Sequence, residues 1–217
     1  MNIEKINKNT WENENVVLHY LSSSKFKNED KTIFNFIKNN IKNINMIDIG
    51  VGGGRTTSFF LDIVDKYIGI DYSRNMIKKC KTRFKDVNFL QMDARNIKFN
   101  DNSFNFVLFS HNAIDYFNQD NRIKILSEMY RICENNGYVC FSSHNLYSYN
   151  KNLNNYNIVS ESILHNTLLS YYVFIQENLK LLNNIGFHDI KLIDRNGNFI
   201  NDYKNDSAWI YYLCKKS

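Results

Sequence analysis

The chain has 217 residues, of which 43% are hydrophobic and 23% charged. That length suits one domain with a substantial buried core, and the composition excludes disorder for the bulk of the chain. No apolar run approaches the roughly 18 residues of a membrane-spanning helix, and the polar start MNIEKINKNTWENEN lacks the apolar region of a signal peptide. We therefore expect a soluble, cytoplasmic protein with no membrane partner.

The net charge of +5 comes from lysines spread along the chain, without a basic run. A solvated basic surface is therefore the favoured interpretation, and a nucleic-acid partner is not. The four cysteines form no C-x-x-C pair, so the sequence supports neither a disulfide framework nor a metal site. They are Cys80, Cys133, Cys140 and Cys214.

From Ile44 onward, strand-length apolar runs alternate with segments of helical period, a pattern typical of a mostly parallel sheet with helices on both faces. Seven strands are predicted, near residues 45–49, 66–70, 87–91, 104–110, 138–142, 188–194 and 209–214. Helical spacing of apolar residues predicts helices over 30–41, 55–64, 75–84, 119–134 and 168–185. Asn135–Gly137 is expected to end the helix over 119–134, and Gly186 the helix over 168–185.

Two segments lie outside this alternation. Residues 1–43 are interpreted as an N-terminal helical cap segment, in front of a domain over 44–217. Residues 145–164 carry no strand signal, and a connection this long is usually functional or mobile. We expect both segments to form a mobile cover over a small pocket. Tyrosines available to wall that pocket are Tyr20, Tyr147, Tyr149, Tyr156, Tyr171 and Tyr172.

The first predicted strand runs into the glycine-rich turn Asp48-Ile49-Gly50-Val51-Gly52-Gly53-Gly54-Arg55. Glycines at this spacing let the backbone approach a ligand closely. A dinucleotide-binding fingerprint would need a glycine where Arg55 stands, so a reductase is the weakest interpretation. An acid two residues before the first glycine also suits a ligand with an amine or a positive charge better than a pyrophosphate.

The next two predicted strands also end in carboxylates, Asp71 and Asp93. A carboxylate at the first of these positions can accept both hydroxyls of a ribose, and one at the second can accept the amine of adenine. Ligands of open α/β sheets bind outside the carboxyl ends of the strands. We therefore expect Asp48, Asp71 and Asp93 to face one ligand, with Tyr72 and Met76 as further contacts.

This order of motifs resembles the class I S-adenosylmethionine-dependent methyltransferases over most of residues 44–215. The resemblance implies a Rossmann-like seven-stranded sheet, mostly parallel with the last strand antiparallel, and S-adenosylmethionine as cofactor, with S-adenosylhomocysteine (SAH) as product. It also implies that the first motif holds the methionine portion of the cofactor. The expected cofactor-binding residues are Asp48, Gly50, Gly52, Gly54, Asp71, Tyr72, Met76, Asp93, Ala94 and Ser110.

The acceptor should lie near the sulfonium, at the ends of the fourth and fifth strands, because methyl transfer is an in-line displacement. Those ends carry His111 and His144. Histidine can take a proton at neutral pH, so both are candidate catalytic bases, each with a packing role as the alternative. The sequence favours oxygen over nitrogen as the methylated atom.

These features predict methylation of a small-molecule substrate, with a surface-glycan or capsule precursor as one setting. The Asn/Asp-Pro-Pro-aromatic loop of base-modifying methyltransferases is missing, since the chain has no proline. A tRNA or protein methyltransferase remains an alternative and would present a continuous positive or grooved face. A module that binds the cofactor or SAH without transfer is another and would have a blocked acceptor channel. Both a monomer and a homodimer fit.

Overall fold

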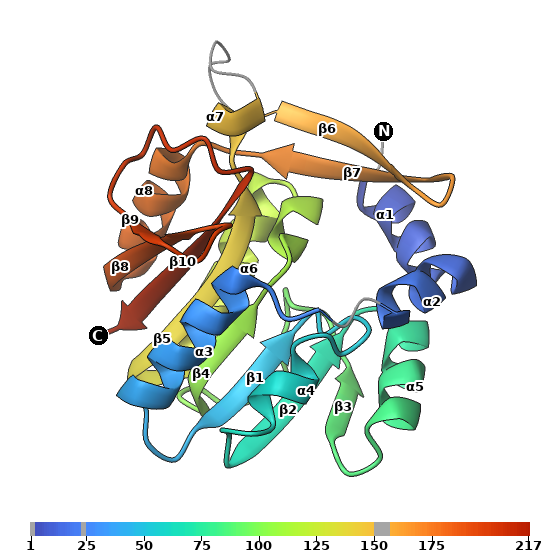
Figure 1. The fold of residues 1–217 in the computed structure, drawn as a ribbon, viewed down its shortest axis with the longest axis horizontal. Helices are drawn as coiled ribbons and strands as arrows, with labels where there is room; N and C mark the ends of the chain where they lie inside the picture. The colour runs from blue at the N-terminus through green and yellow to red at the C-terminus, as the bar shows by residue number, and fades with distance from the viewer. Residues whose placement is uncertain (1–2, 23–24, 150–156) are drawn as a thin grey trace.

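The structure is a computed structural model that describes residues 3–22, 25–149 and 157–217. It is built on one eight-stranded sheet with the order β3-β2-β1-β4-β5-β10-β8-β9 (Figure 1). The strands are β1 (Asn45–Ile49), β2 (Lys66–Asp71), β3 (Asn88–Gln91), β4 (Phe104–Phe109), β5 (Cys133–His144), β8 (Phe187–Asp194), β9 (Phe199–Ile200) and β10 (Trp209–Lys216).

The pairing of these strands confirms the predicted Rossmann-like fold. Strands β1 to β5 pair in parallel, and β10 runs antiparallel between β5 and β8. The sheet has eight strands where seven were predicted, because the two-residue strand β9 adds to the edge at β8. Such a short strand has no periodicity that a sequence could reveal.

Helices cover both faces of the sheet, as the alternation of side chains along each strand requires. Phe106 and Leu108 of β4 pack into the core beneath α3 (Asn28–Asn40), α4 (Thr57–Phe60) and α5 (Arg74–Arg83). Val107 and Phe109 point to the opposite face, beneath α6 (Gln119–Ile132) and α8 (Ile175–Ile185). None of the described helices is long and apolar enough to cross a membrane.

The remaining elements gather near the carboxyl ends of the parallel strands (Figure 1). They are α1 (Ile3–Glu12), α2 (Glu14–Ser22), the 3-10 helix η1 (Ala113–Tyr116), α7 (Leu146–Tyr149) and the hairpin of β6 (Asn157–Ile163) and β7 (Asn166–Tyr172). Helix α1 lies against β7, where Asn7 bridges to the backbone of Leu169. Helices α1 and α2 thus lie over the end of the sheet where a ligand is expected, whereas α3 of the same N-terminal segment packs on a face of the sheet.

The hairpin corrects two sequence predictions. Residues 145–164 were expected to lack strands, yet β6 occupies the last third of that segment. The predicted helix over 168–185 was too long, because β7 runs to Tyr172 and α8 begins at Ile175. Residues 150–156 of the predicted lid, including Tyr156, lie outside the described residues.

Other boundaries also moved. Of the helix predicted over 55–64, only α4 is helical. Helix α6 ends at Ile132, so Asn135–Gly137 lies inside β5, where the pairing with β4 shifts register and Asn136 has a φ of +64°. Gly186 ends α8 as predicted, with a φ of +114° and its N–H donating to the carbonyl of Leu182.

Candidate active site

The turn after β1 forms the floor of a cavity. Gly50 and Gly52 have φ values of +64° and +55°, a conformation that side chains rarely allow. A Cβ added to Gly52 would meet only the carbonyl of Gly50, at 3.8 Å, so this face of the turn is open. A Cβ added to Gly54 would lie 2.6 Å from the ring of Phe84, so Gly54 serves packing within the fold.

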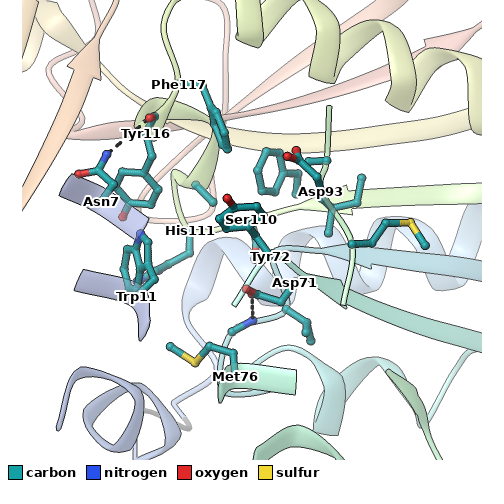
Figure 2. Close-up of a pocket in the computed structure, with 18 of the residues that line it drawn as sticks. Asn7, Trp11, Asp71, Tyr72, Met76, Asp93, Ser110, His111, Tyr116 and Phe117 are labelled. Carbon is teal, nitrogen blue, oxygen red and sulfur yellow. Dashed lines mark hydrogen bonds between the residues drawn. The ribbon is translucent and has the colours of Figure 1, made fainter. Parts of the chain in front are cut away.

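The cavity has a volume of about 370 Å³ and lies at the carboxyl ends of β1, β2 and β4 (Figure 2). Most of the residues predicted to bind the cofactor line it. They are Gly50, Gly52, Asp71, Tyr72, Met76, Asp93, Ala94 and Ser110, joined by the candidate base His111. Their individual roles toward a ligand stay predictions, but the structure brings them to one cavity.

Asp71 is held in place by the backbone. Its Oδ2 accepts the N–H of Gly52 at 2.9 Å, and its Oδ1 accepts the N–H of Ser73 at 2.8 Å. Burial raises the pKa of Asp71 to about 6, although these two hydrogen bonds oppose the shift. The carboxylate is therefore ionised at neutral pH and can accept further hydrogen bonds from a ligand in the cavity.

Asp93 is engaged by a cation that the sequence analysis did not identify. Arg95 binds both carboxylate oxygens, with Nη2 at 2.6 Å from Oδ2 and Nε at 3.0 Å from Oδ1. Burial alone would raise the pKa of Asp93, but the hydrogen bonds and charge of Arg95 outweigh it and lower the pKa. Arg95 also pairs with Glu4 of α1 at 2.6 Å and so ties the N-terminal helix to this end of the cavity.

Asp48 is not on the cavity wall, which corrects the expectation that three carboxylates face one ligand. Its side chain points to the same face of the sheet as Met46 and is only 1% exposed. Its Oδ2 accepts the hydroxyls of Thr56 at 2.6 Å and Tyr67 at 2.8 Å. Through its hydrogen bond with Thr56, Asp48 therefore fixes the segment that follows the glycine turn.

His111 faces the cavity from the loop after β4 (Figure 2). It and Asn112 have φ values of +61° and +57°, a strained conformation that costs about 1–3 kcal/mol per non-glycine residue. His111 is exposed to solvent, although protein surrounds much of its ring. Burial lowers the pKa of His111 to about 3, and the positive charges of Arg55 and Lys27 contribute to the decrease.

His144 does not line the cavity, in contrast to its predicted place beside the acceptor. Its Nδ1 lies 2.9 Å from Oδ2 of Asp115, and its Nε2 lies 3.1 Å from Nδ2 of Asn112. The ring stacks on Tyr172 of β7, with centroids 4.4 Å apart. His144 thus lies behind the strained loop and links it to the hairpin.

A buried ion pair supports this arrangement. Asp115 and Arg122 are both fully buried, with Nη1 and Oδ1 at 2.6 Å. Arg122 also donates to Asn178 of α8 at 3.1 Å, and Ser143 donates to Asp115 at 2.7 Å. The network connects η1, α6, α8 and the end of β5, and sequence patterns gave no sign of it because its members lie far apart in the chain.

The N-terminal helices complete the wall of the cavity. Trp11 of α1 and Tyr20 of α2 line it together with Tyr116 of η1. The sequence analysis proposed Tyr20 as a wall residue but did not identify the other two. The aromatic character of the otherwise polar segment around Trp11 was the available signal.

Arg55, which stands where a dinucleotide-binding fingerprint would need glycine, is a buried residue. It is 8% exposed, lines the cavity with part of its side chain, and forms an ion pair with Asp30 of α3. This pair connects the glycine turn to α3. Two buried carboxylates, those of Asp30 and Asp48, therefore hold the turn and the segment after it in place.

Comparisons with known proteins agree with this geometry. Residues 46–137 match the family model described as a methyltransferase domain. A search of curated proteins gave no match. Among solved structures, the CcbJ methyltransferase from Streptomyces caelestis is 11% identical, with a TM-score of 0.76 over 96% of this chain and 98% of that one.

Two further solved structures share the fold. An S-adenosylmethionine-dependent methyltransferase from Clostridium acetobutylicum is 14% identical, with a TM-score of 0.69 over 90% of this chain and 93% of that one. The glycopeptide N-methyltransferase MtfA, in complex with S-adenosylmethionine, is 12% identical, with a TM-score of 0.69 over 88% and 94%. Residues 46–137 thus match a methyltransferase domain, and the chain shares its fold with solved methyltransferases, among them S-adenosylmethionine-dependent ones.

Proposed function

We propose that the chain is an S-adenosylmethionine-dependent methyltransferase that acts on a small-molecule acceptor, which enters the same cavity as the cofactor. The observation that carries the proposal is that the N-terminal helices form part of the cavity wall. Trp11 and Tyr20 line it from α1 and α2, and its volume of about 370 Å³ is at the low end of the range for small-ligand sites. A nucleotide or side chain of a macromolecule would have to displace these helices to reach the cofactor.

The residues of the cavity fit S-adenosylmethionine. Gly52 presents an open backbone face where a side chain would intrude, and Asp71 offers an ionised carboxylate to the ribose hydroxyls. Tyr72 and Ala94 would flank the adenine, beside the Asp93–Arg95 pair. Bound there, the cofactor supplies an electrophilic methyl group, and the protein's task is to align the acceptor with it.

The preference for an oxygen acceptor stays a prediction that rests on His144 and His111 as bases. His144 lies behind the cavity wall, and the lowered pKa of His111 makes its ring a weak base. Neither histidine now supports oxygen over nitrogen. A surface-glycan precursor as the acceptor is likewise a prediction of the sequence alone.

Tritium-labelled S-adenosylmethionine tests the size of the acceptor. The protein is incubated with cofactor labelled in the methyl group and a cell extract, the products are separated into dialysable and macromolecular fractions, and chromatography resolves new dialysable products from unreacted cofactor, with a protein-free incubation as the blank. We expect the label in the dialysable fraction. Label confined to RNA or protein would contradict the proposal. Pretreating the extract with nuclease and protease provides the matched control, because it should leave the dialysable product unchanged.

A further inference from the structure

Four aromatic rings meet at one end of the cavity. Trp11 lies with its ring centroid 5.1 Å from that of Tyr20 and 5.2 Å from that of Tyr116, and Tyr20 lies 5.9 Å from His111. All four residues line the cavity. In the view of Figure 2, Trp11, His111 and Tyr116 lie on the side of Ser110 away from Asp93. The rings therefore occupy the end opposite the carboxylates expected to bind the nucleoside.

Charges of both signs act on this aromatic end, and the positive charges of Arg55 and Lys27 contribute to the lowered pKa of His111. The ring of His111 is neutral at pH 7 because burial lowers its pKa to about 3. The positive charge of Arg55 is paired with Asp30. The carboxylate of Glu161 in β6 brings a negative charge near the rings. Burial raises the pKa of Tyr20 to about 12, and the Glu161 carboxylate adds to that rise. It likewise contributes to the raised pKa of Tyr116.

The Glu161 side chain is fixed where it can act on the rings. Its Oε1 accepts the hydroxyl of Tyr172 at 3.0 Å and lies 4.0 Å from Nε2 of His144. The hairpin therefore places a carboxylate behind an aromatic wall. Aromatic faces attract ammonium groups through the negative potential of the ring, most strongly when the group is removed from water.

We propose that the end of the cavity formed by Trp11, Tyr20, His111 and Tyr116 receives the acceptor as a small amine, and that the methyl group goes to nitrogen. This inference rests on the proposed function and names its substrate class. It reverses the preference for oxygen that the sequence suggested. The rings stabilise the positive charge on the nitrogen, both in the bound ammonium and in the methylated product.

The displacement keeps a positive charge at the aromatic end. The bound ammonium first gives a proton to water; the lone pair of the resulting neutral amine then forms the new nitrogen–carbon bond while the carbon–sulfur bond breaks, and sulfur keeps the electron pair to give SAH. The positive charge passes from sulfur to nitrogen, where the rings stabilise it. A primary or secondary amine loses its extra proton to water after the transfer. A hydroxyl acceptor would instead need a base that takes its proton during the transfer.

A pair of probes of equal shape separates charge from size. Choline carries a trimethylammonium group, and 3,3-dimethylbutan-1-ol carries an uncharged tert-butyl group in its place. We would titrate each into the protein saturated with SAH and measure the dissociation constants by calorimetry. We expect choline to bind at least about tenfold more tightly than the neutral alcohol. Equal dissociation constants, or no binding of either probe, would overturn the inference.

Substitutions of the aromatic rings test whether these rings cause the preference for choline over the neutral alcohol. Trp11→Leu should abolish the preference for choline, whereas Trp11→Phe, which keeps an aromatic face, should retain most of it. The same contrast is expected for Tyr116→Leu and Tyr116→Phe. Tyr203→Leu is the matched control, because Tyr203 is 47% exposed and is not on the cavity wall. A preference that survives both leucine variants would overturn the inference even if choline binds well.

Failure of the proposed function has a separate signature. If the wild-type protein does not bind SAH, the cofactor site is refuted, and the amine proposal falls with it. If SAH binds and label reaches small hydroxyl compounds but no amine, only the present inference fails. Thermal unfolding of each variant distinguishes a lost ring from a lost fold.

Discussion

One carboxylate oxygen of Asp115 accepts two hydrogen bonds from His144: one from the backbone N–H at 2.6 Å and one from ring Nδ1 at 2.9 Å. Because Nδ1–H donates a hydrogen bond to the carboxylate, the other nitrogen of the neutral ring is left to accept a hydrogen bond from the Asn112 amide at 3.1 Å. His144 therefore holds Asn112, the neighbour of His111, in its strained conformation. It acts on the cavity through this loop.

His144→Ala should lower turnover by about tenfold or more, because the loop that presents His111 loses its support. His144→Gln should restore most of the activity, since its amide can donate to Asp115 and accept from Asn112. Steady-state kinetics of the two variants decide between the roles. A general base cannot be replaced by glutamine, so equal losses in both variants would favour catalysis by the ring itself.

Arg122→Met should destabilise the protein by about 3–5 kcal/mol, because it leaves the Asp115 carboxylate buried without its cation. Chemical denaturation measures the change in the free energy of unfolding. The double variant Asp115→Asn with Arg122→Met should lose less than the single variant, since it removes both charges. Arg195→Met is the exposed control and should change stability by about 0.5 kcal/mol or less. A loss of only about 0.5 kcal/mol in Arg122→Met would contradict the stabilising role of the Asp115–Arg122 ion pair.

The sheet was predictable from sequence because its inner strands are short apolar runs that end in glycine or aspartate. Asp71 and Asp93 follow from this rule, since parallel strands place their carboxyl ends at one edge. The position of Asp48 was also written in the sequence: alternation along β1 puts Ile47 and Ile49 on one face and Asp48 on the other. The family resemblance predicted a ligand-facing Asp48, whereas this alternation places its side chain on the face that carries Met46.

The hairpin was not predictable by the usual signals. Its two-residue turn is Leu164-His165, with φ values of +48° and +64°, where glycine or asparagine is the expected residue. The aromatic end of the cavity was equally hidden, because Trp11 and Tyr116 come together only through the docking of α1. Tertiary contacts decide both features.

Asp48→Asn should remove part of the pH dependence of stability. Burial raises the pKa of Asp48 to about 6, against an unfolded value of about 4. The folded state therefore binds more protons between these values, and stability falls as pH rises through this window. The contribution is about 2 kcal/mol between pH 4 and 7. Unfolding free energies of wild type and variant at both pH values measure it, and identical slopes would contradict the raised pKa.

Helix α1 should be protected by ligand and released by Asn7→Ala. The Asn7 amide donates to the carbonyl of Leu169 at 2.8 Å and accepts its N–H at 2.9 Å, as a backbone group would. Hydrogen exchange should show slower exchange in α1 when SAH is bound and faster exchange in Asn7→Ala. Asn15→Ala, an exposed position in α2, is the control. Equal, strong protection with and without SAH would show a rigid wall instead of a mobile cover.

Calorimetric titration with SAH tests the cofactor site most directly. Wild type should bind SAH and not NADH, because Arg55 stands where the dinucleotide fingerprint needs glycine. Asp71→Ala should weaken SAH binding by about tenfold to a hundredfold, through the loss of charge-assisted hydrogen bonds to the ribose. In wild type the affinity should also fall below pH 6, as Asp71, with its pKa near 6, becomes protonated. Binding of NADH without SAH, or an unchanged SAH dissociation constant in Asp71→Ala, would contradict the account.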